Sequence, residues 1–164
     1  TFEQIVMTDN PPREDFIVID RQVADHTSTK QIDLLALARK DASESFHFLI
    51  LELKLGRNKE LEGKVATQLN EYIERIRSNI RDYVCCYETN YAQKWDMGLF
   101  EPYAEKANMT DRINIDSRPE TVDGMVVVGG YSQLANEAID KLKKAHPDVK
   151  VLPMMRRLNP ADAI

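Results

Sequence analysis

The chain has 164 residues and a formal net charge of −5, with 43% hydrophobic and 30% charged residues. This length predicts one domain over residues 1–164 that buries roughly 70% of the surface of the unfolded chain, and the start at Thr1 leaves open an origin in a longer protein. The mildly acidic balance argues against a protein that coats nucleic acid through a broad basic face, but it allows a local basic groove.

A helix and three strands are expected in the first third of the chain. The stretch 2–12 reads as the last turns of a helix, stopped by the sequence NPP at its end. Three β-rich runs follow at 16–27, 31–38 and 46–55, and polar turns separate them. Consecutive strands joined by short turns predict a meander.

The apolar period then changes to three or four residues, which predicts one helix from Glu60 to about Ile80. Residues 81–115 contain many polar and aromatic residues and read as helical pieces with a loop. Core packing is the commoner use of such aromatics, and a partner surface is the alternative.

The last third of the chain completes the expected sheet. An apolar strand at 125–130 is typical of a sheet covered on both faces. An amphipathic helix follows at 132–146, with Ser132 as its N-cap, and a last strand lies at 149–154. This order of elements predicts an α/β fold in three layers, α/β/α, with a central mixed sheet.

The strand at 46–55 reads FHFLILELKL, and its acid and its amine have no packing reason to stand in an apolar strand. Because side chains alternate between the faces of a strand, Glu52 and Lys54 share one face and the leucines fill the other. Asp33 is likewise an acid among apolar residues of the preceding strand. If Ala38 pairs with His47, the same register sets Asp33 opposite Glu52, and a slip by one residue is resisted by the buried leucines.

Two carboxylates that face each other repel and destabilise a sheet unless a cation neutralises them. A hard divalent cation such as Mg²⁺ binds one or two carboxylates, keeps several waters and removes this repulsion. Lys54 would direct its ammonium group to the same site. The alternative is a pair of exposed charges at a strand end, with an ion pair between Lys54 and Asp33.

These residues resemble the PD-(D/E)XK nuclease superfamily, whose restriction-endonuclease-like fold carries an acid on one strand and (D/E)-x-K on the next. The matching stretches are IDLLAL with Asp33, LELKL with Glu52 and Lys54, and VATQLNEYIERI, in which Gln68 and Tyr72 resemble the QxxxY helix of the RecB-like branch. The order of elements over residues 1–154 is most similar to stand-alone NucS-type nucleases and to the nuclease domain of Shedu-type antiphage proteins.

The resemblance implies that Asp33 and Glu52 bind Mg²⁺ or Mn²⁺ together with the backbone carbonyl of Leu53. Many relatives add a glutamate from the first helix, for which Glu3 is the candidate and Glu14 the second choice.

The resemblance also implies that Lys54 orients the attacking water, and that Gln68 positions the nucleic acid or the water with support from Tyr72. Phosphate contacts are expected from basic residues after the strand, although a solvated helix start explains their charges equally well. These residues are Arg57, Lys59 and Lys64.

The function implied is a metal-dependent nuclease that hydrolyses phosphodiester bonds, in DNA rather than RNA, in repair, restriction or antiphage defence. One departure from the family pattern is Ile32, which replaces the proline of "PD". The alternative is a catalytically degenerate module of the same fold that binds nucleic acid or a partner protein. Endonuclease or exonuclease action, homodimer formation and further domains of a longer chain stay open.

Two other motifs point to little chemistry. The stretch MVVVGGYSQLANEAI has a strand, two glycines and a helix, but it lacks both phosphate-loop patterns. Cys85 and Cys86 are adjacent, so they are poorly placed for a disulfide, and we expect both to be small buried residues. With no signal segment and no apolar run long enough for a bilayer, the sequence predicts a cytoplasmic protein without a membrane partner.

Overall fold

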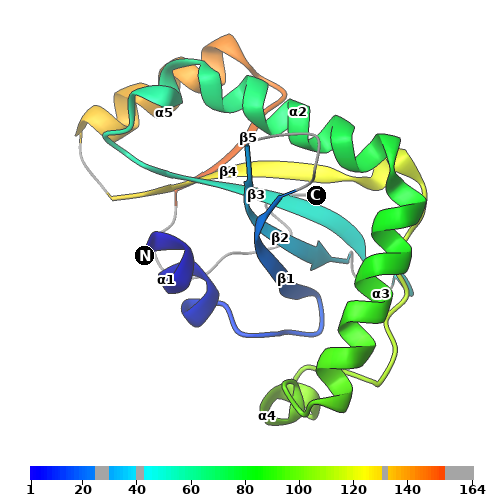
Figure 1. Ribbon diagram of the computed structural model, residues 1–164. Helices are drawn as coiled ribbons and strands as arrows, with labels where there is room; N and C mark the ends of the chain where they lie inside the picture. Colours follow the sequence, from blue (N-terminus) through cyan, green and yellow to red (C-terminus); the bar gives the residue numbers. More distant parts are fainter. Residues whose placement is uncertain (25–29, 40–42, 131–132, 154–164) are drawn as a thin grey trace.

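The computed structural model describes residues 1–24, 30–39, 43–130 and 133–153. It has an α/β fold built on a five-stranded mixed sheet (Figure 1). The strands pair in chain order, which confirms the α/β class and the expected meander. The first three are antiparallel and the last three parallel. They are β1 (Phe16–Val23), β2 (Ile32–Ala38), β3 (His47–Leu55), β4 (Asp123–Gly129) and β5 (Lys150–Pro153).

Helices cover both faces of the sheet, with α2 and α5 on one side and α1 on the other (Figure 1). Among the described residues no helix is both long and apolar enough to cross a membrane. The helical segments are α1 (Phe2–Asp9), η1 (Lys59–Glu62), α2 (Lys64–Ser78), α3 (Ile80–Asp96), α4 (Glu101–Ala104), η2 (Pro119–Thr121) and α5 (Gln133–Ala145).

Strand β3 is buried on both faces, as its unbroken apolar sequence requires. Phe48 and Ile50 pack into the core under α2, α3 and α5. Leu49 and Leu51 pack into the second core, to which α1 contributes Val6. The alternation of side chains along β3 therefore puts Glu52 and Lys54 on the face that α2 covers.

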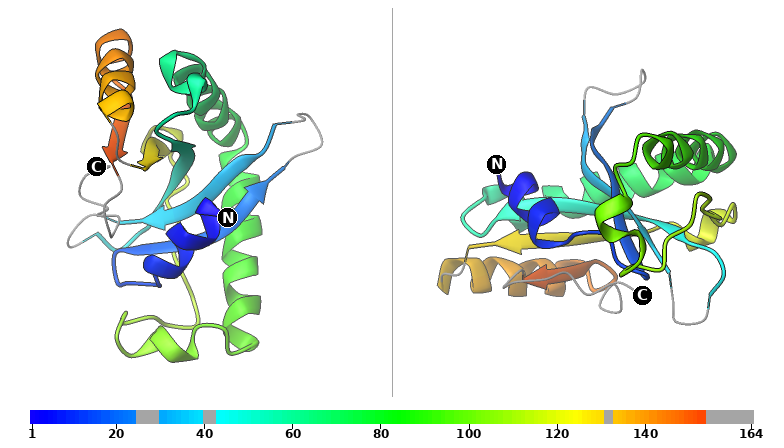
Figure 2. Two further views of the ribbon diagram at one scale, coloured as in Figure 1. Left: turned by 90° about the vertical axis from the view of Figure 1, so that its left-hand side faces the viewer. Right: turned by 90° about the horizontal axis from the view of Figure 1, so that it is seen from below.

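The register between β2 and β3 confirms the expected pairing of Ala38 with His47. This ladder ends at the pair Leu34 and Leu51, whereas β2 continues to pair with β1 as far as Ile32. The two strands therefore separate just before Asp33, and Figure 2 shows the β1–β2 hairpin turning away from β3. We call this opening the fork.

The prediction of one helix from Glu60 to Ile80 is wrong. The structure has the short 3₁₀ helix η1, then α2, and α3 begins only one residue after α2 ends. Gly63 separates η1 from α2, and Asn79 separates α2 from α3, because neither residue has helical backbone angles. The helical pieces expected within residues 81–115 are confirmed as most of α3 and as α4.

The expected burial of Cys85 and Cys86 is also wrong, because both are exposed and free. Tyr83, Tyr87 and Tyr91 recur every four residues of α3 and turn one helix face to the core. The cysteines lie between these positions and face solvent.

The remaining expected elements have close counterparts in α1, β4, α5 and β5. The first strand is shorter than expected because β1 ends at Val23. Residues 25–27 of the expected strand and the N-cap Ser132 lie outside the described residues.

Gly56, directly after β3, is in close contact with α5. A Cβ atom there would lie 2.4 Å from the Cβ of Ala135 and 2.7 Å from the carbonyl oxygen of Gly130. We expect Gly56→Ala to lower the free energy of unfolding by about 1–3 kcal/mol, because backbone must move to relieve the overlap. Urea unfolding measures this effect. Gly63→Ala is the matched control, because nothing lies within 4 Å of its Cβ position; an equal loss in both variants would contradict this account.

Candidate metal centre at the fork of two strands

Glu52 is an ionisable side chain that is fully buried, with 0% of its surface exposed. Its Oε2 has no hydrogen-bond partner among the described residues. Its Oε1 lies 2.8 Å from Nζ of Lys54, so this ion pair is the contact that compensates its charge. Because buried polar atoms are nearly always hydrogen-bonded, the unpaired Oε2 indicates that this carboxylate has room for a further partner.

Asp33 lies on the other side of the fork. Its Oδ2 accepts a hydrogen bond of 2.8 Å from the backbone N–H of Leu53, the residue after Glu52. The side chain of Asp33 thus accepts the hydrogen bond that a backbone carbonyl of β2 would accept if the two strands stayed paired. Since the N–H and C=O of a residue in an extended strand point to the same side, the carbonyl of Leu53 faces this fork as well.

Burial and the neighbouring charges set the ionisation of both acids. Burial and the charge of Asp33 together raise the pKa of Glu52 to about 7, against the opposite effect of Lys54. Burial also raises the pKa of Asp33, although the hydrogen bond from Leu53 opposes the increase. Burial thus favours the protonated form of each acid, and a cation bound between them would lower both pKa values.

Lys54 is buried like Glu52, with 8% of its surface exposed. Its Nζ contacts two carboxylates, Oε1 of Glu52 at 2.8 Å and Oε2 of Glu60 at 3.0 Å. Burial lowers the pKa of Lys54, but these carboxylates raise it more, so the net pKa lies above its ordinary value and the amine stays charged. The sequence did not identify Glu60 as a partner of Lys54. The one feature that could have indicated it is its position, six residues after the lysine and directly before an apolar leucine.

Gln68 and Tyr72 form a hydrogen-bonded chain that ends on β2. Nε2 of Gln68 donates to the hydroxyl of Tyr72 at 2.8 Å, and that hydroxyl donates to the carbonyl of Gln31 at 2.7 Å. Tyr72 is 0% exposed. The pair therefore holds the start of β2, two residues before Asp33, against α2.

The two glutamates considered from the N-terminal region lie in different places. Glu3 accepts a hydrogen bond from Gln22 and is close enough for its charge to raise the pKa of Asp33. Glu14 instead pairs with Arg39, past the opposite end of β2 and about 20 Å from Asp33 along the strand. The structure therefore brings Glu3, and not Glu14, near the fork.

The acids at the fork are a sparse ligand set. Within the described residues no three histidine, cysteine, aspartate or glutamate side chains gather into a metal-binding group. Mg²⁺ is commonly held by one or two carboxylates with water in the other positions, so Asp33, Glu52 and the carbonyl of Leu53 fit its requirements.

The three basic residues expected to contact phosphate are exposed and follow β3 closely. Lys59 and Lys64 border an open groove of about 440 Å³ at the start of α2, together with Glu60. The groove therefore adjoins Glu60, the more exposed of the two carboxylates that contact Lys54. Arg57 lies just before it in the sequence.

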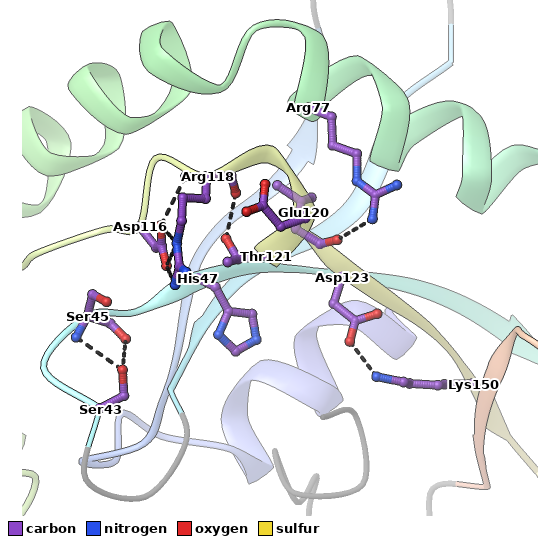
Figure 3. Close-up of a pocket in the computed structure, with 11 residues that line it drawn as sticks. Ser43, Ser45, His47, Arg77, Asp116, Arg118, Glu120, Thr121, Asp123 and Lys150 are labelled. Carbon is purple, nitrogen blue, oxygen red and sulfur yellow. Dashed lines mark hydrogen bonds and ion pairs between the residues drawn. The ribbon is translucent and has the colours of Figure 1, made fainter.

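A second cleft, of about 450 Å³, opens at the other end of the sheet (Figure 3). His47, one of its lining residues, precedes Glu52 by five positions, about 17 Å along β3. Its cations are already engaged. Arg118 pairs with Asp116 at 2.6 Å, and Lys150 pairs with Asp123.

Arg77 is the remaining arginine of this second cleft (Figure 3). It donates to the carbonyls of Pro119 at 3.2 Å and Val122 at 3.1 Å. These contacts tie the end of α2 to the segment before β4. We therefore interpret the cleft as a structural junction.

Comparisons with protein-family models, with curated proteins and with solved structures found no match to this chain.

The raised pKa of Glu52 predicts how the stability of the metal-free protein depends on pH. The folded protein binds this proton more tightly than the unfolded chain, so its contribution to stability falls as the pH rises from 4.5 to about 7. With a chelator present, we expect Glu52→Gln to raise the free energy of unfolding at about pH 8 by on the order of 1–2 kcal/mol, and by less at about pH 5.

Urea unfolding at both pH values measures this difference. Glu62→Gln, which removes an exposed carboxylate from η1, serves as the control and should leave the pH dependence unchanged. Wild-type protein and Glu52→Gln with the same pH dependence would contradict the assignment.

Proposed function

We propose that this chain is a divalent-metal-dependent nuclease of the PD-(D/E)XK superfamily, with a restriction-endonuclease-like fold. The observation that carries the proposal is the buried carboxylate of Glu52, whose Oε2 lacks a hydrogen-bond partner among the described residues. It stands beside a second acid and a lysine where two strands part. The ion pair with Lys54 accounts for Oε1 of Glu52, but it explains neither the unpaired Oε2 nor the second acid.

The residues that would hold the cation are Asp33, Glu52 and the backbone carbonyl of Leu53, and Glu3 of α1 is the acid that would add a ligand through water. All of them offer the hard oxygen ligands that Mg²⁺ and Mn²⁺ prefer. When bound, the cation supplies Lewis-acid stabilisation of negative charge on the scissile phosphate.

Lys54 supplies the other charge at the site. Its buried ammonium group keeps its proton, so it can donate hydrogen bonds to the attacking water or to a non-bridging phosphate oxygen. Donors that are already oriented before reaction stabilise the charge that develops in the transition state. Gln68 and Tyr72 hold β2 in place and thereby fix the position of Asp33.

The proposed substrate is nucleic acid, DNA rather than RNA. The net charge of −5 disfavours a broad basic surface, so contact with the phosphate backbone would be local. Arg57, Lys59 and Lys64 are exposed, and the two lysines border the groove that is also lined by Glu60, a carboxylate partner of Lys54. They would position the backbone without reading its sequence.

Metal binding is the first test. We expect wild-type protein to bind Mn²⁺ in isothermal titration calorimetry, and Asp33→Asn and Glu52→Gln each to weaken the affinity at least about tenfold, because each removes a charged ligand. Glu14→Gln is the matched control, since this carboxylate lies far from the fork. Wild-type protein that binds no divalent ion would favour the degenerate, non-cleaving alternative.

Catalysis is tested at Lys54. We expect Lys54→Ala to keep its Mn²⁺ affinity within about threefold and to lower the plasmid cleavage rate at saturating Mn²⁺ by about 100-fold or more, because the charge-stabilising donor is lost. Lys106→Ala, which removes an exposed lysine after α4, should retain most of this rate. Cleavage by Lys54→Ala at the wild-type rate would remove the lysine from the mechanism.

A further inference from the structure

Glu60 is the second carboxylate on the ammonium group of Lys54. Its Oε2 lies 3.0 Å from Nζ, almost as close as Oε1 of Glu52 at 2.8 Å. The side chain of Glu60 is 45% exposed, whereas that of Lys54 is 10% exposed. The lysine is therefore enclosed by the protein and held between an inner acid and an outer one.

The position of Glu60 is built into the chain after β3. Asn58 turns the chain by donating its N–H to the carbonyl of Leu55 at 2.8 Å, and its Oδ1 accepts the N–H of Glu60 at 2.9 Å. The next residue, Leu61, is 0% exposed and anchors η1 in the core. A capped helix start and a buried anchor thus fix the backbone on both sides of Glu60.

A cation at the fork would change the partners of Lys54. Glu52 is the only acid that both adjoins the fork and contacts the ammonium group in the described residues. When a divalent ion draws on its oxygens, the attraction of Glu52 for Lys54 weakens. Glu60 then remains as the partner that keeps the long, flexible lysine in one orientation.

We propose that Glu60 is a positioning residue that holds Lys54 toward the scissile phosphate while Glu52 binds the metal. This inference rests on the proposed nuclease function. It gives Glu60 no place among the metal ligands and no contact with substrate. The outer acid acts through the lysine, and its effect is on turnover and on the order of the lysine side chain.

The test compares Glu60→Gln, Glu60→Asp and the control Glu62→Gln, whose carboxylate stands on the same 3₁₀ helix but pairs with Lys141 at 3.4 Å. We expect Glu60→Gln to lower plasmid cleavage at saturating Mn²⁺ about 10- to 100-fold while the Mn²⁺ affinity stays within about threefold, since partners of an active-site group commonly have effects of this size. Glu60→Asp should recover part of the rate, and Glu62→Gln all of it.

A second measurement does not need activity. The ¹⁵N signal of the Lys54 ammonium group, assigned by its loss in Lys54→Ala, should be sharp and slow to exchange with water in Mg²⁺-loaded wild-type protein. Glu60→Gln should broaden it or make its exchange fast, and Glu62→Gln should not. An unchanged Lys54 signal in Glu60→Gln overturns the inference, as does an unchanged cleavage rate.

Two further outcomes separate this inference from the proposed function. If wild-type protein binds Mg²⁺ but does not cleave, the nuclease proposal fails, and the Lys54 signal still decides whether Glu60 holds the lysine. If Glu60→Gln weakens Mn²⁺ binding as much as Glu52→Gln does, Glu60 is a ligand and the positioning role is overturned.

Discussion

The candidate site depends on one unfavourable interaction, a buried carboxylate that is paired with one lysine and has one oxygen without a hydrogen-bond partner among the described residues. Leaving a buried polar group unpaired costs about 1–3 kcal/mol, and more when the group is charged. Glu52 bears this cost, and its pKa rises to about 7 as a result. Lys54 compensates part of the charge, but Asp33 adds a second acid to the same fork. A divalent cation would neutralise both acids at once, and for this reason we propose that the fork binds a metal ion.

The sheet is arranged so that this site can exist. The antiparallel half supplies Asp33 from β2, and the register with β3 is fixed because leucines fill the opposite face. In the parallel half, β3 pairs with β4 from Leu49 to Leu55, so Glu52 and Lys54 stand on a rigid strand. The fork opens only where the pairing of β2 with β3 stops. Tyr72 holds the β2 side of the fork in place through its hydrogen bond to Gln31. Packing elsewhere in the sheet thus holds open a place where the backbone is not paired.

Much of this arrangement was predictable from the sequence because a period of two sets the faces of a strand. The alternation in FLILELKL assigned Glu52 and Lys54 to one face, and the short turn between the strands fixed their register with Asp33. The bond from Leu53 to Asp33 was not predictable, since strand separation depends on the twist of the whole sheet. Glu60 was missed because η1 was predicted to be the first turn of a longer helix. The non-helical backbone of Gly63 separates η1 from α2. The exposure of Cys85 and Cys86 depends on the rotation of α3, which only its tertiary contacts set.

Anomalous scattering from a crystal soaked in Mn²⁺ tests the central claim most directly. The account predicts a Mn²⁺ peak in the fork, with one oxygen of Asp33 and one of Glu52 among its ligands at about 2.1 Å. A peak found only elsewhere, or a fork without metal in which Glu52 keeps its contact with Lys54, would contradict the account.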